Sequence, residues 1–304
     1  MPFVLRKWYF DCVTPRGDAF IGYWARLRWD IVRVRYASTL VAPAGGEARE
    51  RLTFLPVAAP APSPRGLRWR CRRLGLASAW HARAPAIERR LLGNASAESG
   101  AAWLDASEPG IAWDCLAPAA TARVRVRGRT LSGLGYAERL TLTLEPWRLP
   151  FHTLHWGRFL ARGGRSLVWI LWESDDDDAT ASTRASPLPA TPPGPVVRPP
   201  AAAGGSPGSA CFVFVDSRPA DVLEFAPDRL VTGEGAQLTL ARERALRAGP
   251  VVSAPLRALP WLGPRVPPAF LAAREEKWLS RGTLVSPGAA PVAGWAIHEI
   301  VRFR

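Results

Sequence analysis

The chain has 304 residues, more than one hydrophobic core usually serves, so we expect two domains. Its formal net charge of +14 comes almost wholly from arginine, because lysine occurs only at Lys7 and Lys277. Such residue usage is typical of a GC-rich coding sequence. The other interpretation is a basic face that binds anionic lipid. No zinc-finger spacing, basic recognition helix or RNA-binding aromatic motif is present, so nucleic acid is not an expected partner.

The N-terminal part of the chain has the pattern of β-strands. Residues 7–13 and 19–29 flank a turn that contains Gly17, which predicts a hairpin. Residues 31–41 alternate apolar and polar side chains over their first half, as a half-buried strand does. The same pattern recurs at residues 67–74, 78–83 and 121–127. An all-β fold follows, with one or two short helices, of which residues 268–279 are the best candidate.

Aromatic residues and histidines concentrate in residues 131–174. This stretch holds two of the four histidines and four of the fourteen tryptophans. Strand-like runs at residues 139–144 and 165–172 frame a predicted Gly-Tyr-Ala-Glu turn at residues 135–138 and a proline-bracketed segment with His152, His155 and Trp156. We expect this region to form the wall of an aromatic-lined cavity.

Residues 175–208 interrupt the strand pattern with four aspartates and a Pro/Ala/Gly/Ser-rich run. Such a composition predicts disorder, because it buries too little apolar surface to offset the entropy of ordering. The segment is either a linker between domains or an excursion within one hairpin, since residues 166–172 and 210–216 are apolar strand candidates of matching length. The aspartates lack the glycine and terminal glutamate of a calcium loop, so we predict no metal site there.

The cysteines and the lengths of the apolar runs indicate the cellular compartment. Four cysteines lie far apart without a C-x-x-C pair, and we expect them to be buried thiols rather than disulfides or metal ligands. No signal-like apolar run or membrane span is found in the sequence. We therefore expect a cytoplasmic protein, with peripheral contact to the inner face of an anionic membrane as an additional expectation.

Three short motifs carry a resemblance to a known family: Lys7-Trp8-Tyr9-Phe10-Asp11, then Gly133-Leu134-Gly135-Tyr136-Ala137-Glu138 followed by His155-Trp156-Gly157-Arg158-Phe159, and finally Gly294-Trp295-Ala296-Ile297-His298-Glu299. Together they resemble the two-domain lipocalin-like superfamily that includes carotenoid 1,2-hydratase (hydroxyneurosporene synthase), tocopherol cyclase and lipocalin-like Diels–Alderases. The resemblance implies two consecutive lipocalin-like antiparallel β-barrels, residues 1–128 and 129–304, with residues 175–208 as an excursion within the second. One departure is that the family's His-Asp-His is Ala137-Glu138-Arg139 here, which keeps a carboxylate and loses both histidines.

The resemblance also implies a chemistry, in which a carboxylic acid protonates a C=C bond of an apolar isoprenoid or polyene and water or an internal hydroxyl captures the cation. The expected partner is a hydrophobic small molecule, with no cofactor and no metal. We assign catalytic roles to Glu138, Asp11, Tyr136 and His155, with Asp114 as a further acid candidate. We assign ligand contacts to Trp147, Trp156, Trp169, Trp172 and His152.

Other interpretations of the same residues remain open at the level of sequence. Glu138 could instead pair with Arg139 or another arginine at a barrel rim, and the histidines and tryptophans could be structural. A non-catalytic carrier of a hydrophobic molecule and a structural protein with a filled barrel are the alternatives to an enzyme. A buried carboxylate facing a cavity would favour the enzyme, and a cavity without that acid would favour the carrier.

Overall fold

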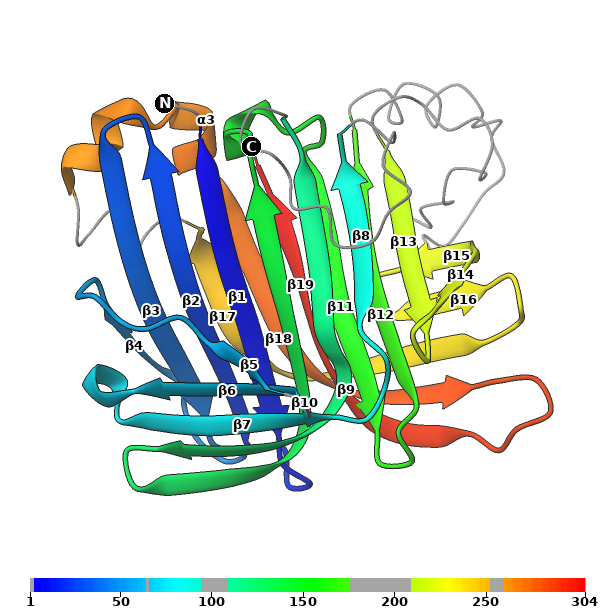
Figure 1. The fold of residues 1–304 in the computed structure, drawn as a ribbon. Coiled ribbons are helices and arrows are strands. Elements are labelled where there is room, and N and C mark those ends of the chain that lie inside the picture. The colour runs from blue at the N-terminus through cyan, green and yellow to red at the C-terminus, as the bar shows by residue number, and fades with distance from the viewer. Residues whose placement is uncertain (1–2, 64–65, 94–108, 175–208, 252–259, 304) are drawn as a thin grey trace. The chain divides into compact units, whose positions relative to one another are not determined.

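A computed structural model describes residues 3–63, 66–93, 109–174, 209–251 and 260–303 (Figure 1). The described residues form two antiparallel sheets, and their only α-helix is one short turn, α3. The chain divides into two compact units, Met1–Arg148 with Gly164–Ser166, and Leu149–Gly163 with Leu167–Arg304. The predicted all-β fold is therefore confirmed.

The first unit contains a ten-stranded sheet in the order β4-β3-β2-β1-β10-β9-β7-β6-β5, with β8 paired to β9 off this path. Its elements are β1 (Val4–Val13), β2 (Ala19–Trp29), β3 (Val32–Ala42), β4 (Arg49–Thr53), β5 (Ala61–Ser63), β6 (Gly66–Cys71), the 3-10 turn η1 (Arg72–Leu74), β7 (Leu76–Ala82), β8 (Ile87–Leu92), β9 (Ile111–Val126), β10 (Arg129–Leu142) and the 3-10 turn η2 (Pro146–Arg148).

The second unit contains a nine-stranded sheet in the order β14-β13-β12-β11-β19-β18-β17-β16-β15. Its elements are β11 (Thr153–Ala161), β12 (Ser166–Glu173), β13 (Ala210–Val215), β14 (Arg218–Ala220), β15 (Val222–Ala226), β16 (Arg229–Thr232), β17 (Gln237–Pro250), the 3-10 turn η4 (Pro260–Arg265), α3 (Pro268–Leu271), β18 (Arg274–Val285) and β19 (Val292–Arg302).

The strand pairings confirm both predicted hairpins. β1 and β2 pair in register around a turn in which Gly17 has φ of 88°, a conformation that glycine adopts without strain. β12 and β13 pair antiparallel from Leu167 opposite Val215 to Trp172 opposite Ala210. The segment between these strands thus connects two arms of one hairpin, although residues 175–208 and the disorder predicted for them lie outside the described residues.

Two local predictions were wrong. The helix expected at residues 268–279 ends at Leu271, and β18 begins at Arg274. There the good intrinsic helix formers are overridden by sheet pairing with β17 and β19, which buries alternate side chains. The Gly-Tyr-Ala-Glu turn expected at residues 135–138 lies inside β10, where a bulge shifts the register on either side of Ala137.

The division between the units also differs from the boundary expected near residue 128. β10 begins at Arg129, and it pairs along its length with β1 and with β9, so it belongs to the first sheet. The compact first unit accordingly extends to Arg148. Backbone pairing between β9 and β10, joined by the tight turn at Arg127 and Gly128, explains why the chain cannot be divided at that turn.

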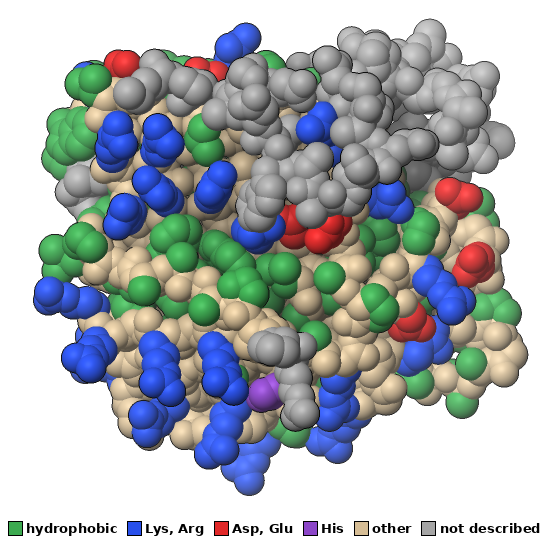
Figure 2. Space-filling model, in the orientation of Figure 1, with side chains coloured by type: hydrophobic (Ala, Val, Ile, Leu, Met, Phe, Trp, Pro, Cys, Tyr) green, Lys and Arg blue, Asp and Glu red, His purple; other side chains and the backbone are tan. Residues whose placement is uncertain are grey.

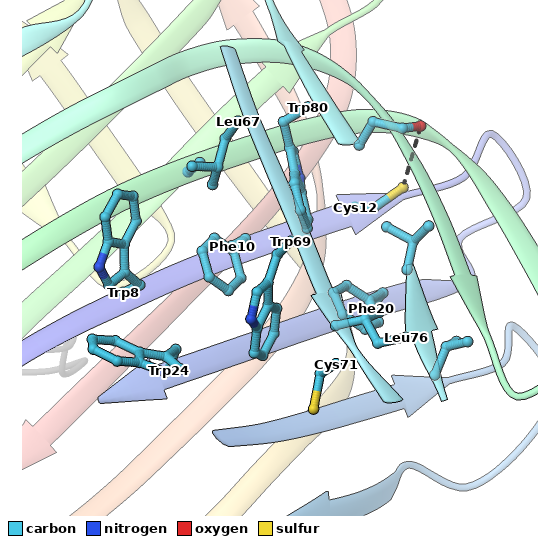
Figure 3. Packing of buried hydrophobic residues seen from close by; sticks show 14 of the residues in the cluster. Trp8, Phe10, Cys12, Phe20, Trp24, Leu67, Trp69, Cys71, Leu76 and Trp80 are labelled. Atoms are coloured by element: carbon cyan, nitrogen blue, oxygen red, sulfur yellow. Dashed lines mark hydrogen bonds between the residues drawn. The ribbon is translucent and has the colours of Figure 1, made fainter. Parts of the chain in front are cut away.

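Aromatic side chains fill the interior of the first unit. Trp8, Phe10 and Phe20 from β1 and β2 meet Trp69 and Trp80 from β6 and β7 (Figure 3). The ring of Phe10 lies 5.0 Å from that of Trp69 and 5.1 Å from that of Trp80. This packing occupies the face of β1 that the even-numbered residues share. The interior of this unit is thus a packed core, and residues that act on a ligand must lie elsewhere.

Candidate active site

Two predicted acid residues and a predicted tyrosine share the opposite face of the first sheet. Side chains alternate along β1, so Tyr9 and Asp11 point away from the core that Trp8 and Phe10 enter. On β10, Ala137 packs in that core, whereas Tyr136 and Glu138 flank it. Strand pairing places Glu138 opposite Tyr9, and Tyr136 opposite Asp11.

Two glycines of the midchain motif permit this close pairing. A Cβ atom at Gly133 would lie 2.0 Å from the carbonyl oxygen of Val13, and one at Gly135 would lie 2.7 Å from Cδ1 of Trp80. The same Trp80 donates a hydrogen bond of 2.6 Å from Nε1 to the backbone carbonyl of Asp11. Gly-x-Gly therefore lets β10 approach β1 and the core indole directly beside the acid residues.

Glu138 is held by two hydrogen bonds that end on one oxygen. Nε1 of Trp113 on β9 donates to Oε2 over 2.6 Å, and the hydroxyl of Tyr136 donates to the same Oε2 over 2.7 Å. Trp113 and Tyr136 are buried, while Glu138 itself is partly exposed. Because an indole N–H can only donate, Oε2 must accept whether or not the carboxyl group is protonated. Two incoming donors make a proton on Oε2 less favourable, so a transferable proton of Glu138 is favoured on Oε1.

Asp11 forms a second carboxyl centre beside Glu138. It is fully buried, and the hydroxyl of Tyr9 donates to its Oδ2 over 3.0 Å. The ring of Tyr9 lies 6.0 Å from the ring of Tyr136 and 5.4 Å from that of Tyr23, in both cases edge-to-face. The predicted residues Asp11, Tyr136 and Glu138 are thus brought together, and we call them, with Tyr9 and Trp113, the carboxyl cluster.

Burial keeps the neutral groups of the carboxyl cluster protonated. Desolvation, followed by the charges of Cys115 and Glu138, raises the pKa of Tyr136 well above its usual value. Desolvation also raises the pKa of the Cys115 thiol well above its usual value, which the hydrogen bond with Tyr136 opposes. Tyr136 is therefore a phenol that donates, and Cys115 is an inert buried thiol.

The remaining acid candidate, Asp114, has a structural partner on the core face. Arg139 donates from Nε over 2.9 Å and from Nη2 over 2.7 Å to Oδ2 of Asp114, and its guanidinium lies 5.5 Å from the ring centroid of Trp8. Arg139 thus forms its ion pair with Asp114, on the side of β10 away from Glu138.

The predicted histidines lie in the second unit. His155 is a buried residue of β11, and its Nε2 lies 3.0 Å from Oε1 of Glu173 at the end of β12. That hydrogen bond is the main cause of the lowered pKa of Glu173. His152 precedes β11, and its Nδ1 lies 2.9 Å from Oγ1 of Thr153. The two histidines therefore have different partners.

A third histidine, His298 on β19, has a strongly lowered pKa. Its Nε2 lies 2.7 Å from Oγ of Ser280, and its ring stands 5.6 Å from that of Trp278 and 6.3 Å from that of Trp169. Burial, then the charges of Arg242 and His155, lowers the pKa of His298 to about 4. His298 is therefore neutral at pH 7, and its Nε2 is placed to accept a hydrogen bond from the hydroxyl of Ser280.

The predicted ligand-binding tryptophans have separate surroundings, and Trp147 is the one that is only partly buried. Trp147 meets Phe3 and Trp29 edge-on in the first unit, at 6.4 and 5.1 Å. In the second unit, Trp172 stacks on Phe151 at 4.9 Å, and Trp169 belongs to the core cluster that includes Phe159. Each of these three rings has a neighbouring aromatic side chain, which is how a core residue packs.

Trp156 has a charged residue beside its ring. Nζ of Lys277 stands 5.8 Å from the centroid of its indole ring, and Trp156 is opposite Glu299 in the pairing of β11 with β19. Lys277 is buried and forms ion pairs with Glu299 and with Glu275. Trp156 thus has neighbours that could orient a polar group of a ligand.

Sequence reasoning missed several members of these clusters. The sequence offered a reason to consider Tyr9 and Trp113 as site residues. Tyr9 stands between the motif residues Trp8 and Phe10, and Trp113 precedes the acid candidate Asp114. Ser280 and Glu173 carried no such signal, since only the pairing of β18 with β19 and the fold of β11 and β12 bring them to His298 and His155.

Comparisons with known proteins identify the fold. No protein-family model matches the chain, and no curated protein matches it in sequence. Among solved structures, CghA with Sch210972 has a TM-score of 0.57 at 14% identity over 99% of this chain and 89% of that chain. Kievitone hydratase from Nectria haematococca has a TM-score of 0.52 at 9% identity over 98% and 88%. The chain has a lipocalin-like fold.

The lipocalin-like likeness extends over nearly the whole chain, but at these identities it concerns the fold alone. A shared fold does not define an activity, which depends on this chain's own side chains. Within the described ranges, no group of three or more His, Cys, Asp or Glu side chains could hold a metal ion, and no helix is long and apolar enough to cross a membrane. The cysteines that the structure describes, Cys12, Cys71, Cys115 and Cys211, are all free thiols.

Proposed function

We propose that this lipocalin-like protein is an enzyme of the hydratase or cyclase type, which transfers a proton to a C=C bond of an apolar isoprenoid or polyene. The observation that supports this most is the anchoring of Glu138. Trp113 and Tyr136 both donate to its Oε2, so the proton of the carboxylic acid is directed to Oε1. Two solved structures with this fold support the class, since one is a hydratase and the other holds a small molecule.

The proposed reaction has two steps. Oε1–H of Glu138 gives its proton to one alkene carbon, and the electron pair of the double bond forms the new C–H bond, which leaves a cation on the neighbouring carbon. Water, or a hydroxyl group of the substrate, then forms the C–O bond and returns a proton to the Glu138 carboxylate. Aromatic faces near the reacting carbons would stabilise the cation, and the carboxyl cluster contains the rings of Tyr9, Tyr136 and Trp113.

Asp11 and the phenols have supporting roles in this proposal. Asp11 is a second carboxyl group of the same cluster and is held by Tyr9, which makes it the candidate to orient the attacking water. Tyr136 keeps its proton because of its raised pKa, so it positions Glu138 and does not compete as a base. Trp156, next to Lys277, and His155, beside Glu173, belong to the second unit, and no step of this proposal uses them.

The test is a conservative substitution at Glu138. Glu138→Gln keeps an oxygen that can accept from Trp113 and Tyr136, but its amide cannot transfer a proton. We expect the variant to fold, to keep its ligand affinity and to lose turnover by about 10²–10⁴-fold, the usual range for a positioned general acid. The assay combines C20 to C40 isoprenoids, detection of a mass gain of one water or of a cyclic isomer, and tryptophan quenching as a separate measure of binding.

Glu145→Gln is the matched control, because Glu145 lies in the same unit and pairs only loosely, over 3.6 Å, with Arg148. Turnover should be unchanged in this variant. Unchanged turnover in Glu138→Gln would rule out Glu138 as the acid and make Asp11→Asn the next variant. Saturable quenching by the wild-type protein with no product from any substrate would favour the carrier of a hydrophobic molecule.

A further inference from the structure

A row of five arginines covers one face of β1, β2 and β3 near the turn between β2 and β3. Arg26 on β2 lies opposite Arg6 on β1 and opposite Arg35 on β3. Two residues closer to the turn, Arg28 on β2 lies opposite Arg33 on β3. Residues directly opposite in an antiparallel sheet share a face, so all five side chains project to the same side. Figure 2 shows Lys and Arg side chains gathered over the ends of these strands.

The arginines of this row repel one another. Burial is the first cause of the lowered pKa of Arg26, and the charges of Arg35, Arg28, Arg6 and Arg33 are the next causes. Within the described part of the chain, no ion pair joins Arg26, Arg28, Arg33 or Arg35 to a carboxylate. Like charges directly opposite one another destabilise a sheet, and an anionic surface laid against this face would relieve that repulsion.

An exposed apolar side chain stands at the end of the same hairpin. Ile31 is 75% exposed and follows Asp30, whose φ of 51° turns the chain. At a rise of about 3.4 Å per residue, Arg28 and Arg33 stand within about 10 Å of Ile31, and Arg26 and Arg35 about 7 Å further along the strands. The apolar tip and the positive charges are thus close enough to meet one interface together.

This combination fits a phospholipid surface better than a nucleic acid. Isoleucine can enter the boundary between headgroups and acyl chains while arginines contact the phosphates. A nucleic-acid surface would use exposed aromatic rings for stacking. The nearest indole, Trp29, instead packs edge-on against Phe3 at 6.5 Å and Trp147 at 5.1 Å.

We propose that Arg6, Arg26, Arg28, Arg33 and Arg35, with Ile31 at the tip, form a docking surface for anionic phospholipid membranes. This proposal extends the proposed function and rests on it. Docking would bring the enzyme to a bilayer, in which an apolar isoprenoid substrate dissolves. The docking itself requires no substrate and no turnover. It is therefore tested separately, so that a protein that docks but does not catalyse is distinguished from one that catalyses but does not dock.

The experiment measures co-sedimentation of the full chain with vesicles of phosphatidylcholine containing about 30% phosphatidylserine, at low and high salt. An arginine near an anionic surface contributes about fivefold to partitioning, so Arg28→Gln with Arg33→Gln should weaken binding by about 25-fold. Ile31→Ser should weaken it at both salt concentrations, since insertion of an apolar side chain is not screened. Pure phosphatidylcholine vesicles should bind the protein weakly.

The matched control is Arg123→Gln with Arg125→Gln, which removes the same charge from exposed positions on β9. This variant should bind almost as the wild type does, and circular dichroism would check that both double variants fold. An equal loss in both double variants would overturn the docking surface in favour of general charge attraction. Failure to bind anionic vesicles, or tighter binding to a single-stranded oligonucleotide that depends on Arg28 and Arg33, would overturn it as well.

Discussion

A Cβ atom at Gly157 would lie 2.1 Å from Cζ2 of Trp169, so the indole ring of β12 lies directly on the backbone of β11. The same atom would stand 2.7 Å from Cβ of His298. The glycine of the motif His155-Trp156-Gly157-Arg158-Phe159 therefore has a packing role, in which it makes room for an aromatic side chain inside the second unit. Gly135 has the same relationship to Trp80 in the first unit.

Gly157→Ala should destabilise the protein by overpacking, by about 1–3 kcal/mol or more, since neither Trp169 nor His298 can move without disturbing the sheet. Gly163→Ala is the matched control, because a Cβ there meets nothing within 4 Å. Urea unfolding followed by tryptophan fluorescence gives both free energies. Equal stability of the two variants would show that the indole of Trp169 can be displaced at little cost.

Much of the first sheet was predictable from the sequence, because the hairpin at Gly17 and the alternation in residues 31–41 are local patterns. The acid candidates were found through motifs, and strand pairing brings Asp11 and Glu138 together. The second donor to Glu138 was not predictable. The bulge around Ala137 sets the register between β9 and β10, and thereby places Trp113 on the face of Glu138. No local pattern of side chains encodes that register.

His298 should make stability depend on pH below neutrality. Its pKa is about 4 in the folded protein against an ordinary value of 6.5, so between these values the unfolded chain binds a proton that the folded chain does not. Stability should therefore fall as the pH drops from 6.5 to about 4, and this contribution should not change further below that range. A shift of this size corresponds to about 3 kcal/mol.

The measurement for His298 is urea unfolding at pH 7 and pH 4.5 in wild type and in His298→Gln. The variant should lose less stability on acidification than the wild type, because the titrating group is gone. His81→Gln, at an exposed position of β7, serves as the control and should behave as the wild type does. An identical loss in His298→Gln and wild type would contradict the lowered pKa of His298.

The hairpin of β12 and β13 leads to a prediction about the segment between them. The strands pair directly from Leu167 with Val215 to Trp172 with Ala210, so we expect the hairpin to keep its register when the connecting segment is shortened. Replacing residues 177–206 by a short Gly-Ser turn should leave the melting temperature within about 5 °C, since loop length changes closure entropy only slowly. Loss of soluble protein on replacement would show that the segment packs against the folded chain.

Tyr136→Phe removes the hydroxyl that donates to Glu138 while the buried ring stays in place. It should cost about 0.5–1.5 kcal/mol, with Trp113 still holding Oε2. The raised pKa of Tyr136 adds a pH signature. Above about pH 10 the phenol of Tyr136 ionises in the unfolded chain but keeps its proton in the folded protein. The stability of the wild type should therefore fall with rising pH, and the stability of Tyr136→Phe should fall less. Tyr36→Phe, at a partly exposed ring on β3, is the control. Unfolding at pH 8 and pH 10.5 separates the two variants, and an equal change of slope in Tyr36→Phe would show that Tyr136 is not the group responsible.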